Sequence, residues 1–269
     1  MNPEPYPVIL VHGWNSHPGI WNRLMPCLSK ASIPFLKFDH SGMNSADISE
    51  RATALEASIN EMREECGYTG PVDIVCHSVG TCITRYLLEV TDGTAQSQKV
   101  RLLIGLGPPN NGSALAELFH DPQRGGEIIN RLTGVFLKPG FDPATDAIVQ
   151  DVRPGSPAMQ TLSSAGIRPD ITYRIIVTSN PGGRPEFFPM FHGKTWVLSS
   201  DGKWQDTYSG DGIVPHSESR LPGISLDVLP LDPIDSVLLP SPDQYCHINL
   251  PKNPVVIERI MQYLTGAGQ

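Results

Sequence analysis

The pentapeptide Cys-His-Ser-Val-Gly, residues 76–80, lies between a β-branched run at 71–75 and an apolar stretch at 79–90. This order predicts a buried strand, a tight turn and a helix, with Ser78 at the apex of the turn. Such a turn holds its serine in a strained backbone conformation and needs small residues two positions before and after it. Cysteine and glycine are both small, although the motif G-x-S-x-G begins with glycine.

Further strand and helix signals alternate along the chain. Apolar or β-branched runs predict strands at 6–11, 35–39, 71–75, 100–106, 171–178 and 223–229, and helical periodicity predicts helices at 18–30, 48–66, 79–90 and 254–264. We expect Asn44 or Ser45 to cap the helix at 48–66, Gly67 to end it, and Asn253 to cap the last helix. The alternation predicts one α/β domain over 1–269, with a mostly parallel central sheet flanked by helices.

Residues 108–170 carry no strand signal, and this stretch is too long for an ordinary connection. Short amphipathic helices are predicted at 114–119 and 128–136. We interpret the stretch as a cap or lid insertion over a site at the sheet edge; the alternative is that its helices only cover the flank of the sheet. No regular structure is predicted for 180–210, and 230–244 is predicted to be a loop.

Three groups of polar residues join Ser78 at the predicted carboxyl ends of strands or in later loops. His12-Gly13-Trp14 directly follows the first strand, Asp211 lies between two glycines, and His247 precedes the last helix. Parallel strands expose their carboxyl ends at one edge, so the first group and Ser78 should share that edge. Taken singly, each group is also explained by an ordinary turn.

Composition excludes several classes of function. The formal net charge of −8 offers no basic excess for nucleic acid, and no run is long enough to span a membrane. The histidines and five cysteines show no metal-ligand spacing, so we predict neither a metal nor a cofactor. Without a visible leader sequence we expect a cytoplasmic protein, or a secreted one whose leader has been removed.

Over nearly its whole length the chain resembles the α/β-hydrolase superfamily, in particular lipases and esterases of bacterial and archaeal type. The resemblance rests on Val-Ile-Leu-Val-His-Gly-Trp at 8–14, Cys-His-Ser-Val-Gly at 76–80, Asp-Gly-Ile-Val-Pro at 211–215 and Cys-His-Ile-Asn-Leu-Pro at 246–251. Two more runs, 107–113 and 153–157, resemble segments that flank the lid in such lipases.

The resemblance implies that Ser78 is a nucleophile, His247 its general base and acid, and Asp211 the carboxylate that orients the histidine. These residues occur in the chain order of the α/β-hydrolase triad. The backbone amides of Trp14 and Val79 would form the oxyanion hole. Substrate contacts are expected from His12, Gly13, Leu115, Leu118 and Phe119.

Alternatives remain open at this stage. Asp206, Asp232, Asp235 and Asp243 are other candidate acids, and His77 is interpreted as a structural residue that points away from the site. We expect a serine carboxylic-ester hydrolase that acts on a small acyl ester or lipid, with transient contact with a lipid interface and no nucleic-acid partner. A thioesterase, a phospholipase A, an amidase, an acyltransferase and a catalytically silent scaffold are the other readings.

Overall fold

A six-stranded sheet forms the centre of the molecule in the computed structural model, which describes residues 5–230 and 241–266. The strand order is β2-β1-β3-β4-β5-β8, and each neighbouring pair is parallel. The predicted α/β class with a mostly parallel sheet is therefore confirmed. The strands are β1 (Val8–Val11), β2 (Phe35–Phe38), β3 (Val72–His77), β4 (Val100–Leu106), β5 (Thr172–Thr178) and β8 (Leu226–Leu229).

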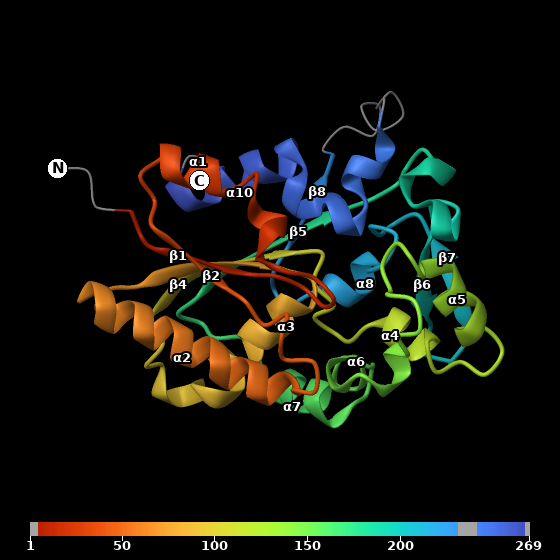
Figure 1. Cartoon of the computed structure of the whole chain (residues 1–269), viewed down its shortest axis with the longest axis horizontal. Coiled ribbons are helices and arrows are strands. Elements are labelled where there is room, and N and C mark those ends of the chain that lie inside the picture. Colours follow the sequence, from red (N-terminus) through yellow and green to blue (C-terminus); the bar gives the residue numbers. More distant parts are fainter. Residues whose placement is uncertain (1–4, 231–240, 267–269) are drawn as a thin grey trace.

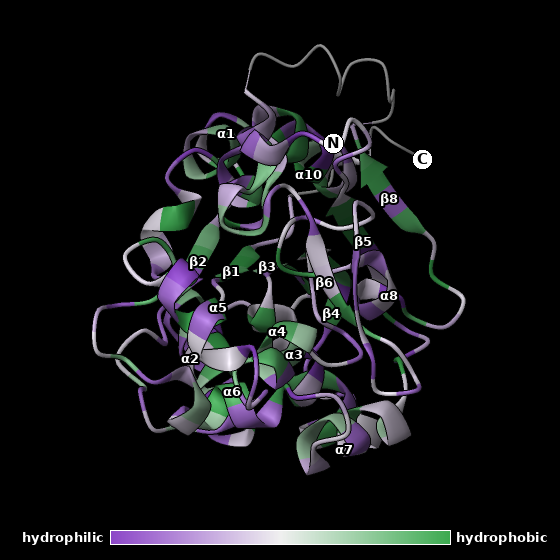
Figure 2. Cartoon of the chain, turned by 90° about the vertical axis from the view of Figure 1, so that its right-hand side faces the viewer, coloured by the Kyte–Doolittle hydropathy of each residue, from purple (hydrophilic) through white to green (hydrophobic). Residues whose placement is uncertain are grey.

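Helices cover both faces of the sheet (Figure 1). The α1 and α10 helices lie on one face, and α2 and α3 lie on the other. A third group stands beyond the carboxyl ends of the strands, and Figure 2 looks onto that edge, with α4, α5 and β6 in front of the strand ends. The helices are α1 (Met25–Lys30), α2 (Ile48–Cys66), α3 (Val79–Arg85), α4 (Ala114–Leu118), α5 (Gly125–Leu132), α6 (Ala147–Asp151), α7 (Pro157–Ala165), α8 (His216–Ser219) and α10 (Pro254–Thr265).

The central strands are apolar because helices bury them from both sides. Every residue of β1 and β3 is buried, and in β4 only Arg101 is partly exposed. Continuous runs of valine, isoleucine and leucine suit a parallel sheet covered on both faces, where alternation of polar residues would bury unpaired groups. The core of the molecule lies on the two sides of these strands.

Helix α2 begins later than its cap was predicted to lie. Its N-cap is Asp47, not Asn44 or Ser45: the Asp47 carboxylate accepts the Glu50 amide, and the Glu50 carboxylate accepts the Asp47 amide in return. This reciprocal capping box satisfies two amides at once, which a lone asparagine or serine would not. The predicted end at Gly67 is confirmed, since Gly67 has a left-handed conformation.

Several other predicted boundaries were wrong. The stretch 18–30 divides into a 3-10 turn, Pro18–Trp21, and α1. The helix after Ser78 is α-helical only to Arg85 and continues as a π-helix at Tyr86–Thr91. The second helix of the insertion occupies 125–132, not 128–136, because Thr133 leaves the helical conformation. The cap of the last helix, Asn253, is confirmed.

Two helices and a β-hairpin were not predicted from the sequence. Helices α6 and α7 lie in the stretch predicted to be a cap, and a β-hairpin of β6 (Thr195–Leu198) and β7 (Trp204–Thr207) lies in the stretch left without structure. Of the predicted loop at 230–244, residues 231–240 lie outside the described part, and Pro242–Tyr245 form a 3-10 turn. Among the described helices none is both long and apolar enough to cross a membrane.

We predict that Gly80→Ala destabilises the fold by about 2 kcal/mol or more. A Cβ atom at Gly80 would lie 2.4 Å from the His12 carbonyl oxygen and 2.8 Å from that of Val11. Both are backbone atoms, so α3 would have to move away from β1. Urea unfolding measures the change.

Gly126→Ala is the matched control, because a Cβ atom there meets nothing within 4 Å and Gly126 lies exposed in α5. Alanine should leave stability unchanged or raise it by about 0.5 kcal/mol. Equal unfolding midpoints for the two variants would contradict the close contact at Gly80.

Candidate active site

Ser78 lies at the sharp turn between β3 and α3. Its backbone has φ 55° and ψ −131°, a conformation that non-glycine residues rarely adopt. The Ser78 amide donates to the Leu106 carbonyl in the neighbouring strand at 2.9 Å, which holds the turn against the sheet. The predicted elbow is therefore present, with its serine 8% exposed.

Cys76, the residue that departs from the usual motif, fits the contact between strand and helix. Its side chain is fully buried, and its sulfur lies 3.1 Å from the Thr84 hydroxyl on α3. Burial raises the pKa of the Cys76 thiol to about 12, so the thiolate does not form near neutral pH. A nucleophilic role for Cys76 is excluded on these grounds, and the elbow accommodates its side chain.

Ser78, His247 and Asp211 form a continuous chain of hydrogen bonds. The His247 Nδ1–H group donates to Asp211 Oδ2 at 2.7 Å, and the Ser78 hydroxyl lies 3.0 Å from His247 Nε2. An ionised carboxylate only accepts hydrogen bonds, so it fixes the His247 tautomer that leaves Nε2 free to accept the serine proton. The sequence predicted this set of three residues only from the order of the motifs along the chain. The fold places their side chains in hydrogen-bond contact.

The Asp211 carboxylate is held in place from all sides. Its Oδ1 atom accepts the amides of Ile213 at 3.0 Å and Val214 at 2.7 Å, and its backbone carbonyl accepts the His247 amide. A Cβ atom at Gly107 would lie 2.5 Å from Asp211 Oδ2, so only glycine fits opposite the carboxylate. A buried carboxylate with these donors keeps its orientation without the histidine's help.

Of the four alternative acids the structure describes two, Asp206 and Asp243, and neither hydrogen-bonds to His247. Asp206 pairs with Lys194 in the hairpin, at 2.9 Å, and Asp243 is an exposed residue whose backbone carbonyl binds the Asn249 side chain. Asp232 and Asp235 lie outside the described residues.

His77 was expected to point away from the site, but it contacts the candidate base. Its Nε2–H group donates to the His247 backbone carbonyl at 3.0 Å, and the two ring centroids lie 4.7 Å apart. The Nδ1 atom of His77 is buried without a partner among the described residues. Burial holds the pKa of His77 well below its ordinary value, so the ring is neutral. No pattern of residues in the sequence predicts this contact, because His77 and His247 are far apart in the chain.

A histidine network fixes the loop after β1. The His12 Nδ1–H group donates to the Gly13 carbonyl at 2.8 Å, and the His40 Nε2–H group donates to the His12 carbonyl at 2.9 Å. The rings of His12 and His40 are stacked with centroids 3.9 Å apart, and Arg51 donates to His40 Nδ1. Burial, the largest cause, lowers the pKa of His40 to about 3, so the His40 ring is neutral and its Nδ1 atom accepts from Arg51.

This network orients the candidate oxyanion donors. The Gly13 carbonyl and the Trp14 amide belong to one planar peptide, so the bond from His12 fixes the direction of the Trp14 N–H group. Within the described residues the Trp14 amide makes no hydrogen bond. A Cβ atom at Gly13 would touch Ser78 Cβ at 3.0 Å, which places the loop directly against the serine. The Val79 amide lies in the first turn of α3, where amides lack helical partners.

The insertion packs onto this loop through aromatic rings. The Trp14 indole contacts Phe119, Phe136 and Phe141, with ring centroids 5.5 to 6.1 Å apart. All three phenylalanines belong to the stretch predicted to form the cap. Whether that stretch opens as a lid stays a prediction.

Two pockets meet at Trp14. A larger one of about 620 Å³ includes His12 and Gly13 in its wall, and a narrow apolar one of about 30 Å³ includes Leu115 and Phe119. Leu118, also expected to contact substrate, is fully buried and lines neither pocket, because it faces the core side of α4.

In the described part of the chain no group of three or more His, Cys, Asp or Glu residues is arranged to hold a metal ion.

We predict that His40 makes the fold less stable in acid. Below pH 6.5 the unfolded chain binds a proton at His40 that the folded chain does not bind until about pH 3. Stability from this residue is complete above pH 6.5 and falls between pH 6.5 and 3, by up to about 1.4 kcal/mol per pH unit. Urea unfolding of the wild type and His40→Gln at several pH values tests this, since the variant should show the smaller slope and equal slopes would contradict it.

Solved structures with the same fold include three enzymes. The Bacillus licheniformis lipase BlEst2 in mature form aligns at a TM-score of 0.67 with 20% identity, over 98% of this chain and 93% of its own. Phospholipase PlaB from Legionella pneumophila aligns at 0.65 with 16% identity, over 96% and 59%, and the metagenomic carboxyl esterase MGS0156 at 0.63 with 15%, over 99% and 77%. They support the α/β-hydrolase fold of lipases and esterases. No curated protein has a detectably similar sequence.

A family model matches residues 7–167, which hold β1 to β4, the elbow and most of the insertion. Its description is domain of unknown function (DUF7379). The match covers more than half of the chain and includes Ser78 and the His12 loop, while Asp211 and His247 lie beyond it. The chain belongs to the DUF7379 family and has the α/β-hydrolase fold.

Proposed function

We propose that the chain is a serine carboxylic-ester hydrolase that works through an acyl-enzyme. The observation that carries this proposal is the hydrogen-bonded chain from Ser78 through His247 to Asp211, at 3.0 and 2.7 Å. Serine is a weak nucleophile at neutral pH and needs a base within hydrogen-bond reach, and the base needs a third group to orient it. Both requirements are met here, in a buried site.

In the proposed reaction, His247 Nε2 takes the proton of Ser78 as the serine oxygen attacks the ester carbonyl. The Trp14 and Val79 amides stabilise the negative oxygen that develops. The protonated His247 then gives its proton to the leaving alcohol, and the acyl group stays on Ser78. Water, deprotonated by the same histidine, releases the acid and restores the serine.

The comparisons support the ester-hydrolase reading at the level of fold. Similar structures carry the names lipase, carboxyl esterase and phospholipase, at 15 to 20% identity. Those names describe the similar proteins and do not define the substrate of this chain.

We expect Ser78→Ala to lower hydrolysis of p-nitrophenyl acetate by about 10³-fold or more, and Asp211→Asn by about 10³-fold, because each removes one member of the chain. Initial rates across p-nitrophenyl esters from acetate to palmitate, with circular dichroism to check folding, measure this. Asp243→Asn is the control and should stay within about twofold of wild type. A folded Ser78→Ala variant that keeps wild-type activity would disprove the proposed function.

We also expect His77 to act as a positioning residue. His77→Phe keeps a ring but removes the donor to the His247 carbonyl, so kcat should fall about tenfold with little change in KM. His77→Gln offers an amide N–H at a similar distance and should recover part of kcat. A shift of the pH profile of kcat should accompany the Phe variant, and equal loss in both variants would point to packing alone.

A further inference from the structure

Ser78 itself lines neither of the two pockets that meet at Trp14, but its neighbours line both. Gly13, in the wall of the larger pocket, lies directly against Ser78 Cβ, and Val79, the next residue after Ser78, lines the narrow pocket. Trp14 and Ile148 line both. An ester whose carbonyl carbon is at Ser78 Oγ can therefore extend its two parts into two different environments.

The narrow pocket is apolar and small. It is lined mainly by valine, leucine, isoleucine and phenylalanine side chains, and the one hydroxyl in its wall, Ser113, accepts the Ala116 amide. Its volume of about 30 Å³, against about 620 Å³ for the larger pocket, makes it much the narrower of the two. Its small size favours a short acyl group over a long chain.

The larger pocket, which we call the polar pocket, offers unused hydrogen-bonding groups. The side chains of Ser16, Asn44 and Lys138 line it and make no hydrogen bond to other described residues. His17 accepts the Gly19 amide at Nδ1, which leaves its Nε2–H as a donor. The Arg51 guanidinium also lines the polar pocket, but it is occupied by the Ala46, His40 and Met43 carbonyls and the His40 ring.

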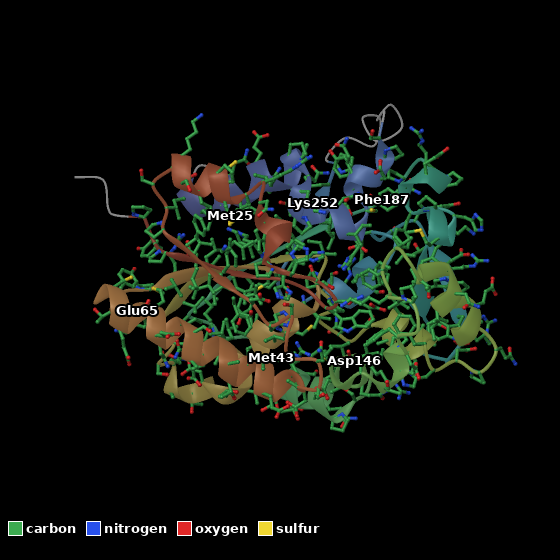
Figure 3. All side chains as sticks on the ribbon, viewed as in Figure 1. Met25, Met43, Glu65, Asp146, Phe187 and Lys252 are labelled. Carbon is green, nitrogen blue, oxygen red and sulfur yellow. The ribbon has the colours of Figure 1, made fainter. Side chains whose placement is uncertain are left out.

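Aromatic surface completes the polar pocket. Trp14 and Phe141 both line it, with ring centroids 6.1 Å apart. A few polar groups placed around aromatic walls are the usual means of binding and orienting a small organic molecule. Asn44, from the loop after β2, and Asp146, from the insertion, both line the pocket, which therefore lies between these two segments; Figure 3 labels Asp146 and Met43, the residue before Asn44.

Three charged residues line the polar pocket: Arg51, Lys138 and Asp146. Three further carboxylates, Asp47, Glu50 and Asp151, lie near Arg51 outside the wall. His12 and His40 are neutral. A site for phosphate or another anion needs a positive excess. Counted with the three carboxylates near Arg51, the region has four negative and two positive side chains, which favours an uncharged ligand rich in hydroxyl groups over an anion.

We propose that the polar pocket binds the alcohol part of the substrate, an uncharged polyol of the size of glycerol or a hexose, and that the narrow pocket holds a short acyl group. This substrate class rests on the proposed ester hydrolysis. In the first step the bond between the acyl carbon and the polyol oxygen breaks and a bond to Ser78 Oγ forms. The serine proton passes through His247 to the polyol, and water then releases a short carboxylic acid.

Three esters test the proposal because they change one part of the substrate at a time. They are 6-O-acetylglucose, 6-O-octanoylglucose, which changes only the acyl group, and hexyl acetate, which changes only the alcohol. For the wild type we expect kcat/KM on 6-O-acetylglucose to exceed both others by about tenfold or more. Preference for the octanoyl ester or for hexyl acetate would overturn the proposal.

Variants of the polar pocket provide the second arm. Asn44→Ala and Lys138→Ala should each lower the ratio of kcat/KM on 6-O-acetylglucose to that on hexyl acetate by about fivefold, since each removes a hydrogen bond to the polyol. Both residues are exposed, so the fold should not depend on them. Lys203→Ala, at an exposed position in the hairpin turn, is the matched control and should leave the ratio unchanged.

The outcomes separate this proposal from the one on which it rests. Hydrolysis that depends on Ser78 but shows no preference for the polyol ester, or ratios that do not change in the two variants, would overturn the substrate class and leave the serine hydrolase standing. A folded wild type that cleaves none of the three esters and no p-nitrophenyl ester would overturn both.

Discussion

The positive φ of Ser78 is the constraint on which the arrangement of the site depends. This backbone conformation costs on the order of 1 to 3 kcal/mol, and it persists because contacts with the surrounding backbone hold the turn in place. The Ser78 amide is bound to Leu106 in β4, and Gly80 brings α3 almost into contact with the His12 carbonyl. The same contact that forces the serine out of the sheet therefore also places the loop of His12 and Gly13 beside it. The candidate nucleophile and the candidate oxyanion donors are therefore positioned by the same backbone contact.

Four buried imidazoles then complete the site, and each has a fixed role as donor and acceptor. His12 and His247 carry the proton on Nδ1, and His40 and His77 carry it on Nε2, as their backbone and carboxylate partners require. His12 and His40 orient the Trp14 peptide, and His77 binds the carbonyl of His247. Burial disfavours charge on His12, His40 and His77, so these three do not compete with the transient positive charge on His247 that the proposed mechanism needs.

Local patterns and motif order made much of this predictable. The buried strands were predictable because each is an apolar run. Ser78, Asp211 and His247 were predictable because each lies in a turn or loop pattern and the three occur in the chain order of the triad. What could not be predicted depends on contacts between distant segments. The role of His77 requires knowing where the His247 carbonyl points, and the strands of the hairpin at 195–207 have only four residues each, too few for their alternation to be recognised. Residues 107–113 and 153–157, linked only by resemblance, prove to touch, since a Cβ atom at Gly112 would lie 2.8 Å from Pro154.

Trp14 contributes to the site in two independent ways. Its amide is a candidate donor to the oxyanion, held by the His12 bond to the preceding carbonyl, whereas its indole separates the two pockets and contacts the phenylalanines of the insertion. Because the donor belongs to the main chain, another side chain at position 14 would present the same N–H group. The shape of both pockets can therefore diverge at this position among related sequences without loss of the candidate oxyanion donor, which makes it a natural point for evolution, or for an engineer, to change which ligands fit.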